Sequence, residues 1–323
     1  MLVALGRRAQ RTIQNASPWT NIYGTARSIL ALSSAMTLLS TPLAALFHPI
    51  AGGSGVHPSC VLGAQRMGLF CQAQDHMGFA RWLAIGILLV VATGFRPRWT
   101  AIPHWWIALS ISDNATLIEG GDQLTANLAL LMIPIALTDP RKWHWQPAPT
   151  RSDSLGSDAA KLVAVTARLL IQLQVAVVYF HAAVGKLGVE EWKDGTVLYY
   201  WLLHPTFGAP HWLSPVVSWS LKNGAFVAML TWGVIALEYL LSAALFMPKR
   251  FWPFLLVGGF GLHAGIVLIH GLFSFGMVMF AALILYLRPW ERPFTRPERR
   301  AAIVAGDAAS ATAATPTVAS SAP

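Results

Sequence analysis

The sequence has 323 residues, of which 55% are hydrophobic and 11% are charged, and its formal net charge is +9. The charged fraction is under half of the roughly 25% that is usual in soluble globular proteins, which excludes an ordinary soluble domain. The positive charge does not predict nucleic-acid binding, because the basic residues form short clusters beside apolar runs. The composition predicts an all-α, polytopic integral membrane protein whose partner is the lipid bilayer.

Apolar runs of membrane-spanning length follow one another along the chain. They predict a bundle of about eight transmembrane helices joined by short loops, at 28–47, 82–95, 103–119, 122–138, 162–187, 224–247, 252–270 and 273–287. We predict a transmembrane domain over 28–290, with a cytoplasmic segment (1–27) before it. The Ala/Thr/Ser/Pro-rich tail (291–323) is predicted to be disordered and cytoplasmic.

The basic residues predict the orientation. Seventeen of the 23 Lys and Arg lie in the N-terminal segment, in the connections 96–98, 139–161 and 248–250, and in the chain from Arg288 onward. By the positive-inside rule both termini are cytoplasmic. The only two cysteines, Cys60 and Cys71, then fall on the outer, oxidising side, where they could form a disulfide. In the inverted orientation they would be two free thiols.

The turn between the third and fourth spans contains Gly120 and Gly121, which permit a tight reversal. Asp122 is either the N-cap of the fourth span or a functional group. Asp113 and Asn114 lie deeper in the apolar layer, where solvation is harder, so they are candidates for lining a cavity.

The fifth span carries more polar residues than a lipid-facing helix needs. A spacing of three and four places one set of residues on a single helical face: Arg168, Gln172, Val175, Tyr179, Ala182 and Lys186. Gln174 and His181 lie on roughly the opposite side. A helix that is polar on two sides is predicted to be surrounded by protein at the centre of the bundle.

The two cations of this span cannot serve one site, because 18 residues of helix separate Arg168 from Lys186 by about 27 Å. Arg168 is interpreted as a snorkelling or capping cation. Lys186 is either a structural lysine paired with Glu190 or Glu191, or a partly desolvated base.

Two further ionisable residues lie in later spans, and intramembrane ionisable groups usually have a partner or a function. Glu238 and His263 stand on consecutive antiparallel spans, so each could satisfy the other structurally or both could belong to a site. The histidines show no metal-ligand spacing, and no metal site is predicted.

A motif in and after the fifth span suggests a family. The sequence reads YFHAAVGKL at 179–187 and EWKDGTVLYY at 191–200. This pattern resembles the HTTM (horizontally transferred transmembrane) domain superfamily, which includes the vitamin K-dependent γ-carboxylases and the bacterial SdpB-like (sporulation-delaying) proteins. The Gly-Gly-Asp turn at 120–122 and the DPRKWHW run at 139–145 are similar to SdpB-like members in particular.

The resemblance implies roles that spacing alone does not. In the carboxylases the motif lysine is the base that activates vitamin K hydroquinone, and it corresponds to Lys186. A vitamin K-like quinone is therefore a candidate cofactor, with Glu238 and His263 as assisting catalytic residues. The carboxylases continue into a long lumenal domain without a counterpart after residue 290, so glutamate carboxylation is not expected. Further candidate site residues are Tyr179, His181, Trp192, Gly195, Asp113 and Asp122.

SdpB-like proteins are linked to the maturation of a secreted antimicrobial peptide together with a partner protein. The resemblance thus implies a bacterial inner (plasma) membrane protein that assists maturation or export of a peptide toxin, with a secreted peptide precursor and an accessory maturation protein as partners. The alternatives are a quinone-using, carboxylase-like membrane enzyme with Lys186 as base, and a non-enzymatic transporter or immunity protein.

Overall fold

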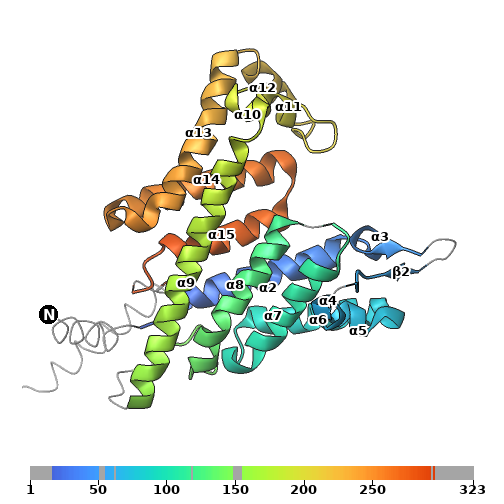
Figure 1. Cartoon of the computed structure of the whole chain (residues 1–323), viewed down its shortest axis with the longest axis vertical. Coiled ribbons are helices and arrows are strands. Elements are labelled where there is room, and N and C mark those ends of the chain that lie inside the picture. The colour runs from blue at the N-terminus through green and yellow to red at the C-terminus, as the bar shows by residue number, and fades with distance from the viewer. Residues whose placement is uncertain are drawn as a thin grey trace, which may run out of the picture. The chain divides into compact units, whose positions relative to one another are not determined.

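The computed structural model describes residues 17–50, 55–61, 63–117, 119–147, 155–291 and 294. These residues are mostly helical, as Figure 1 shows. The long helices are α2 (Asn21–Ser40), α6 (Met77–Thr93), α7 (Pro97–Asn114), α8 (Gly120–Thr138), α9 (Leu155–Lys186), α13 (Gly224–Ala243), α14 (Trp252–His270) and α15 (Phe273–Leu287). The N-terminal arginines Arg7, Arg8 and Arg11, and the predicted tail apart from Glu291 and Phe294, lie outside the described residues.

Short elements connect the long helices. The helical ones are α3 (Leu43–Leu46), α4 (Gly63–Arg66), α5 (Leu69–Gln72), α10 (Glu190–Lys193), α11 (Val197–Leu202) and α12 (Ser214–Ser220), with 3₁₀ turns η1 (Gln74–His76), η2 (Ala244–Phe246) and η3 (Lys249–Phe251). Two antiparallel two-residue strands, β1 (His48–Pro49) and β2 (Val56–His57), pair His48 with His57.

Five helical segments are long and apolar enough to cross a membrane: Gln74–Thr93, Gly120–Thr138, Gly156–Lys186, Gly224–Phe246 and Lys249–His270. The apolar helix Phe273–Leu287 is shorter. A multi-pass helical membrane protein is therefore confirmed at this level. Each of the eight predicted spans overlaps a helix, but α2, α7 and α15 fall short of the length or apolarity of a span. The predicted number of eight spans is not confirmed.

Proline and glycine explain why several helix ends differ from the predicted span ends. The first span was predicted at 28–47, whereas α2 begins at Asn21 and ends at Ser40. Pro42 follows Thr41, whose backbone is extended, as residues before proline usually are. Conversely, α7 begins at Pro97, because proline fits the first helical turn.

The connection at 139–161, predicted to be cytoplasmic, is partly helical. Residues 148–154 lie outside the described part of the chain, but α9 already begins at Leu155. With 32 residues, α9 is about 48 Å long, which exceeds the roughly 30 Å hydrocarbon core of a bilayer.

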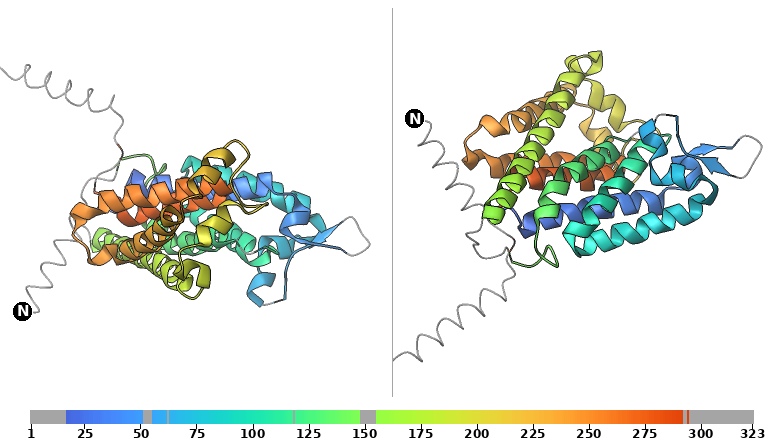
Figure 2. Two further views of the ribbon diagram at one scale, coloured as in Figure 1. Left: turned by 90° about the horizontal axis from the view of Figure 1, so that it is seen from above. Right: turned by 60° about the horizontal axis from the view of Figure 1, so that its bottom comes forward.

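The centre of the bundle is formed by α2 and α15. These helices pack side by side, and α9 crosses α15 steeply (Figures 1 and 2). From Ala281 to Leu287 the α15 side chains are almost all buried, and Ile22, Tyr23 and Ala26 in the first turns of α2 are fully buried. The residues 21–27, predicted as part of a separate segment, therefore belong to the core.

Helix α9 is buried on one side only, so its prediction as a fully enclosed central helix is wrong. The face with Gln172, Val175 and Tyr179 packs into the bundle. The opposite face is exposed and almost entirely aliphatic, with residues such as Leu169, Leu173 and Val177. Such a face suits contact with lipid tails. The prediction rested on Gln174 and His181 outside the buried face, and these two polar residues do not require that protein surround the helix.

The connection that follows α8, at residues 139–146, ties several helix ends together. Arg141 forms a bidentate ion pair with Asp139, at 2.7 and 2.9 Å, and both side chains are buried. Arg141 also donates to the carbonyl oxygens of His144 and Gln146 (both 2.9 Å). The ring of His144 packs against Gly24 of α2 and against Gly94 after α6, where any larger side chain would collide with it. This connection is thus a structural clasp.

Removing one partner of the buried ion pair should destabilise the protein strongly. We expect Arg141→Ala to lower the free energy of unfolding by roughly 3–5 kcal/mol, because it leaves the Asp139 carboxylate buried and uncompensated. The exposed neighbour Lys142 provides a matched control, since Lys142→Ala should change stability by less than about 0.5 kcal/mol. Unfolding of the purified protein in detergent measures both. Equal effects of the two substitutions would contradict a stabilising role of the Asp139–Arg141 ion pair.

Stability should also depend on pH through His144. Burial lowers the pKa of His144 to about 3, and the positive charges of Arg27 and Arg141 contribute to this shift. Between pH 6.5 and about 3 the unfolded chain therefore binds more protons at this residue than the folded chain, so stability falls as the pH drops through this window. Within this window the contribution of His144 to the free energy of unfolding falls by up to about 1.4 kcal/mol for each pH unit. The free energy of unfolding, measured at several pH values, should fall more steeply with decreasing pH for the wild type than for His144→Gln. The same pH dependence in both proteins would show that His144 does not cause the effect.

Candidate functional site

The most distinctive polar contact in the bundle lies at the C-terminal end of α9. Lys186 is the last residue of α9, and its Nζ donates to Oε1 of Glu238 on α13 at 2.7 Å. The exposed fractions of the two side chains are 20% and 9%. Lys186 also donates to the carbonyl oxygen of Ala182 and stands 5.1 Å from the centre of the Trp192 ring, in cation–π geometry. The lysine is held on three sides.

A second pair lies further along the same face of α9. The hydroxyl of Tyr179 and Nε2 of His263 on α14 are hydrogen-bonded at 2.9 Å, and both residues are buried. The ring of Phe275 on α15 packs edge-on against His263. Tyr179 and Lys186 are seven residues apart, so about 10 Å of helix separates the two pairs.

The pairing of the three predicted catalytic residues differs from the predicted one. One alternative placed these residues in a site; in the other, Glu238 and His263 would satisfy each other and Lys186 would pair with Glu190 or Glu191. Instead, α9 lies against both α13 and α14 through this polar face and supplies a partner to each. Glu190 instead lies 3.7 Å from Lys193, three residues further along α10.

The Lys186–Glu238 pair and the Tyr179–His263 pair each contain one buried polar atom that has no hydrogen-bond partner. These atoms are Oε2 of Glu238 and Nδ1 of His263. A buried polar group that lacks a partner is costly, and native structures usually satisfy it with water or a ligand. The two atoms are therefore the acceptors or donors that this region can offer to a bound molecule.

The turn after α9 positions Trp192 against Lys186. Gly195 has a φ of 83°, a conformation that side-chain-bearing residues rarely adopt. A Cβ there would lie 2.9 Å from Cβ of Ala228 on α13. The Trp-x-x-Gly part of the motif thus has a structural explanation: glycine lets the turn reverse while α13 packs closely against it.

The other cation of the predicted fifth span, Arg168, has a partner as well. Arg168 donates to the Glu291 carboxylate at 2.9 Å, and its guanidinium lies 5.0 Å from the centre of the Trp290 ring. This ion pair gives Arg168 a specific partner, and its interpretation as a snorkelling or capping cation stays a prediction. The sequence offered no signal for this contact, because 123 residues separate the two partners.

Two proteins of Bacillus subtilis (strain 168) are similar to this chain over most of its length. The uncharacterized protein YitO is 38% identical over 277 residues, which cover 84% of this chain and 87% of YitO. Sporulation-delaying protein SdpB is 33% identical over 286 residues, which cover 88% of this chain and 86% of SdpB. The chain belongs to the SdpB family. No protein-family model and no solved structure matches it, so the wider resemblance to HTTM domains and carboxylases stays a prediction.

In this SdpB-family protein the Gly-Gly-Asp turn is a packing site. Helix α8 begins at Gly120 with Glu119 as its N-cap, so the predicted N-cap role of Asp122 is wrong; Asp122 lies buried in the first turn. Gly121 lies against the backbone of Phe275, which leaves little room for a side chain.

The polar residues at the end of α7 hold a loop. The amide of Asn114 donates to the carbonyl oxygens of Ser59 and Gln65, both at 3.0 Å, and the half-buried Asp113 accepts from Gln65 through its backbone. A cavity-lining role for Asp113 and Asn114 stays a prediction.

The remaining candidates lie apart from the Lys186 pair. His181 is exposed on the outer face of α9, beside Phe180.

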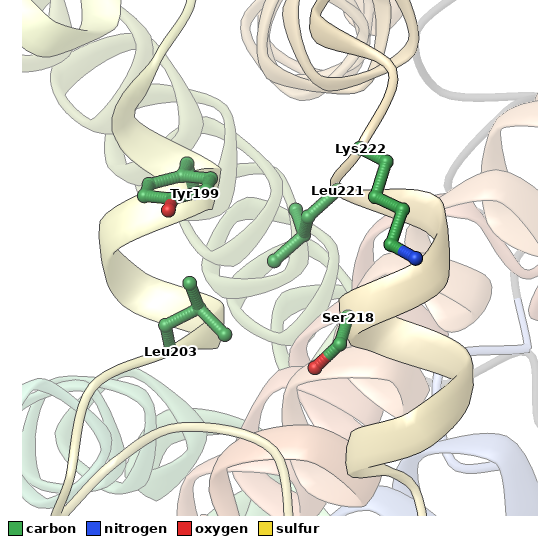
Figure 3. A pocket seen from close by; sticks show the side chains of 5 residues that line it. All are labelled: Tyr199, Leu203, Ser218, Leu221 and Lys222. Carbon is green, nitrogen blue, oxygen red and sulfur yellow. The ribbon is translucent and has the colours of Figure 1, made fainter.

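Within the described ranges, no three His, Cys, Asp or Glu side chains gather as metal ligands would. An open cavity of about 400 Å³ lies between α11 and α12 (Figure 3), and none of the predicted site residues lines it. Its lining residues are Tyr199, Leu203, Ser218, Leu221 and Lys222.

The sequence did not predict one cluster of three buried polar residues. Tyr23 and Arg27 of α2 and His104 of α7 are almost fully buried near the Asp139–Arg141 clasp, and each retains an unpartnered polar atom. The available signal was an arginine and a histidine inside segments that otherwise read as helical and apolar.

Cys60 and Cys71 form a disulfide with their Cα atoms 5.9 Å apart. If both termini are cytoplasmic, this disulfide lies on the outer side of the membrane and forms in living cells. Alkylation of whole cells with a thiol-reactive mass tag should leave the protein unshifted, whereas prior reduction should add two tags. The Val61→Cys variant, whose position is 77% exposed, should accept one tag without reduction. Two tags on the unreduced wild type would contradict the predicted orientation.

Proposed function

We propose that this SdpB-family protein assists the maturation or export of a secreted antimicrobial peptide at the plasma membrane. Both its family membership and the motif at 179–195 support this role. Its partners in this proposal are the peptide precursor and an accessory maturation protein. The termini lie in the cytoplasm, so the end of α9 that carries Lys186 faces the outer side.

The observation that carries the proposal is the Lys186–Glu238 pair. It joins the last residue of α9 to the interior of α13, both candidate membrane spans, next to a tryptophan and with one carboxylate oxygen unpartnered. A charged pair at that position can receive a polar or charged group of a peptide that arrives within the apolar layer, where few other polar partners exist.

A second candidate function is a quinone-using, carboxylase-like enzyme with Lys186 as base and Glu238 and His263 assisting. The unpartnered Oε2 of Glu238 and Nδ1 of His263 favour it, because a quinone needs hydrogen-bonding groups for its oxygens. A quinone would supply the redox chemistry. The residues of this chain would hold the ring and accept a proton at Nζ of Lys186.

Substitutions at Lys186 separate these functions. If the ion pair receives the peptide, Lys186→Ala should reduce the amount of active secreted peptide at least about tenfold, equivalent to ~1.4 kcal/mol. Lys186→Arg should retain a large part of it, because arginine keeps the positive charge. Peptide activity in the medium of cells that express the precursor measures the effect, and the amount of the membrane protein is monitored by immunoblot.

A charge exchange and a distant ion pair complete this experiment. Glu238→Lys should abolish peptide production, and adding Lys186→Glu should restore part of it if the pair is required as a pair. Arg168→Ala, which removes the ion pair with Glu291, is the matched control and should have little effect. Complete failure of both Lys186→Arg and the exchange would favour the base, because arginine cannot release its proton. Full activity of Lys186→Ala would refute both functions.

A further inference from the structure

The segment between α9 and α13 has an unusual composition. We call residues 188–223 the aromatic cap; it contains α10, α11 and α12. Between Asp194 and Lys222 the chain has 27 residues without a single Asp, Glu, Lys or Arg. About a quarter of the residues of a soluble domain are charged, so a loop in water should contain about seven. This stretch instead contains the aromatic residues Tyr199, Tyr200, Trp201, Phe207, Trp212 and Trp219.

The aromatic side chains of the cap point outward. Trp219, Trp212 and Tyr200 have exposed fractions of 74%, 68% and 59%. The large hydrophobic side chains exposed on α9 are by contrast aliphatic, apart from Phe180. The outer surface therefore changes its chemistry between the end of α9 and the cap, from aliphatic to aromatic.

The exposure of these side chains reflects an ordered structure. The cap has a small apolar core of its own, formed by Leu202, Val217 and Leu221 together with Val227 of α13. Gly195 packs on Ala228, and the His270 ring at the end of α14 is hydrogen-bonded to the Phe207 carbonyl oxygen. The aromatic side chains are thus held outward by a packed scaffold.

The cap also stands at the end of membrane-spanning helices. It packs on the first turns of α13 and on the last residues of α14, and both belong to candidate membrane spans (Figure 1). Tryptophan and tyrosine concentrate at the boundary between headgroups and acyl chains, because their rings combine an apolar body with a polar N–H or O–H group.

We propose that the aromatic cap lies in the interfacial layer of the bilayer, with Trp212, Trp219 and Tyr200 inserted among the lipid headgroups and upper acyl chains. The occupant of this surface is the lipid bilayer itself. Lys222, which is exposed at the rim of the cavity in Figure 3, can reach lipid phosphates. The charges of α10 mark the side of the cap that faces water. This inference does not depend on the proposed role in peptide maturation.

Depth-resolved fluorescence quenching tests the proposal. The native cysteines are paired, so a single introduced cysteine can be labelled with a small environment-sensitive fluorophore. Trp219→Cys and Val216→Cys report on the cap, and the latter leaves every aromatic residue in place. Leu173→Cys, exposed in the middle of α9, is the membrane control, and Glu190→Cys, on the charged side of the cap that faces water, is the water control. The full-length protein is reconstituted in vesicles of phosphatidylcholine and phosphatidylglycerol that carry a nitroxide either near the headgroup or deep in the acyl chain.

The cap labels should be quenched more by the headgroup nitroxide than by the deep one, and the label at position 173 should show the reverse order. Aqueous iodide should quench the label at position 190 several times more than the cap labels. Iodide quenching of the cap labels equal to that at position 190 would overturn the proposal. Protection of the cap labels from both iodide and lipid nitroxides would overturn it too, because it would show that protein covers the surface.

Discussion

A charged side chain inside an apolar helix bundle has to find a partner, and this constraint organises the structure. Lys186 pairs with Glu238 across α9 and α13, Arg168 pairs with Glu291 beyond α15, and Arg141 pairs with a nearby aspartate in a buried connection. Each contact ties one helix end to another segment. Because desolvated charges are expensive, separating the partners of the two mostly buried pairs, Lys186–Glu238 and Arg141–Asp139, would be costly. The ion pairs thus fix the helix ends that apolar packing alone would leave free to slide.

The two ends of the bundle differ in what their polar groups do. At one end, the connection after α8 buries Asp139, Arg141 and His144 against α2 and α6, and glycines allow the close approach. This end is built for stability. At the other end, the Lys186–Glu238 pair is only partly covered and retains an unpartnered oxygen. The polar groups there are the ones that a bound molecule could use. In an SdpB-family protein, the proposed bound molecule is a peptide precursor.

The aromatic cap connects this second end to the membrane. The cap begins two residues after Lys186, and its first turn contains Trp192 and Gly195. A cap anchored in the interfacial layer would hold the Lys186 pair at a defined depth, and the rigid turn would transmit that position to α9. The same residues that resemble a family motif thus serve as the structural link between the polar pair and its surroundings.

The sequence by itself determined that the protein is helical and membrane-embedded, because runs of apolar residues have few other stable arrangements in a bilayer. It also identified Lys186, Glu238 and His263 as unusual, since ionisable residues in apolar segments are conspicuous at any position. It did not determine their partners. Glu238 and His263 both pair with α9 rather than with each other, because contacts between residues 52 and 84 positions apart depend on helix packing. Burial was likewise decided by the tertiary structure: helical periodicity defines the faces of α9, and only its neighbours determine which face meets lipid.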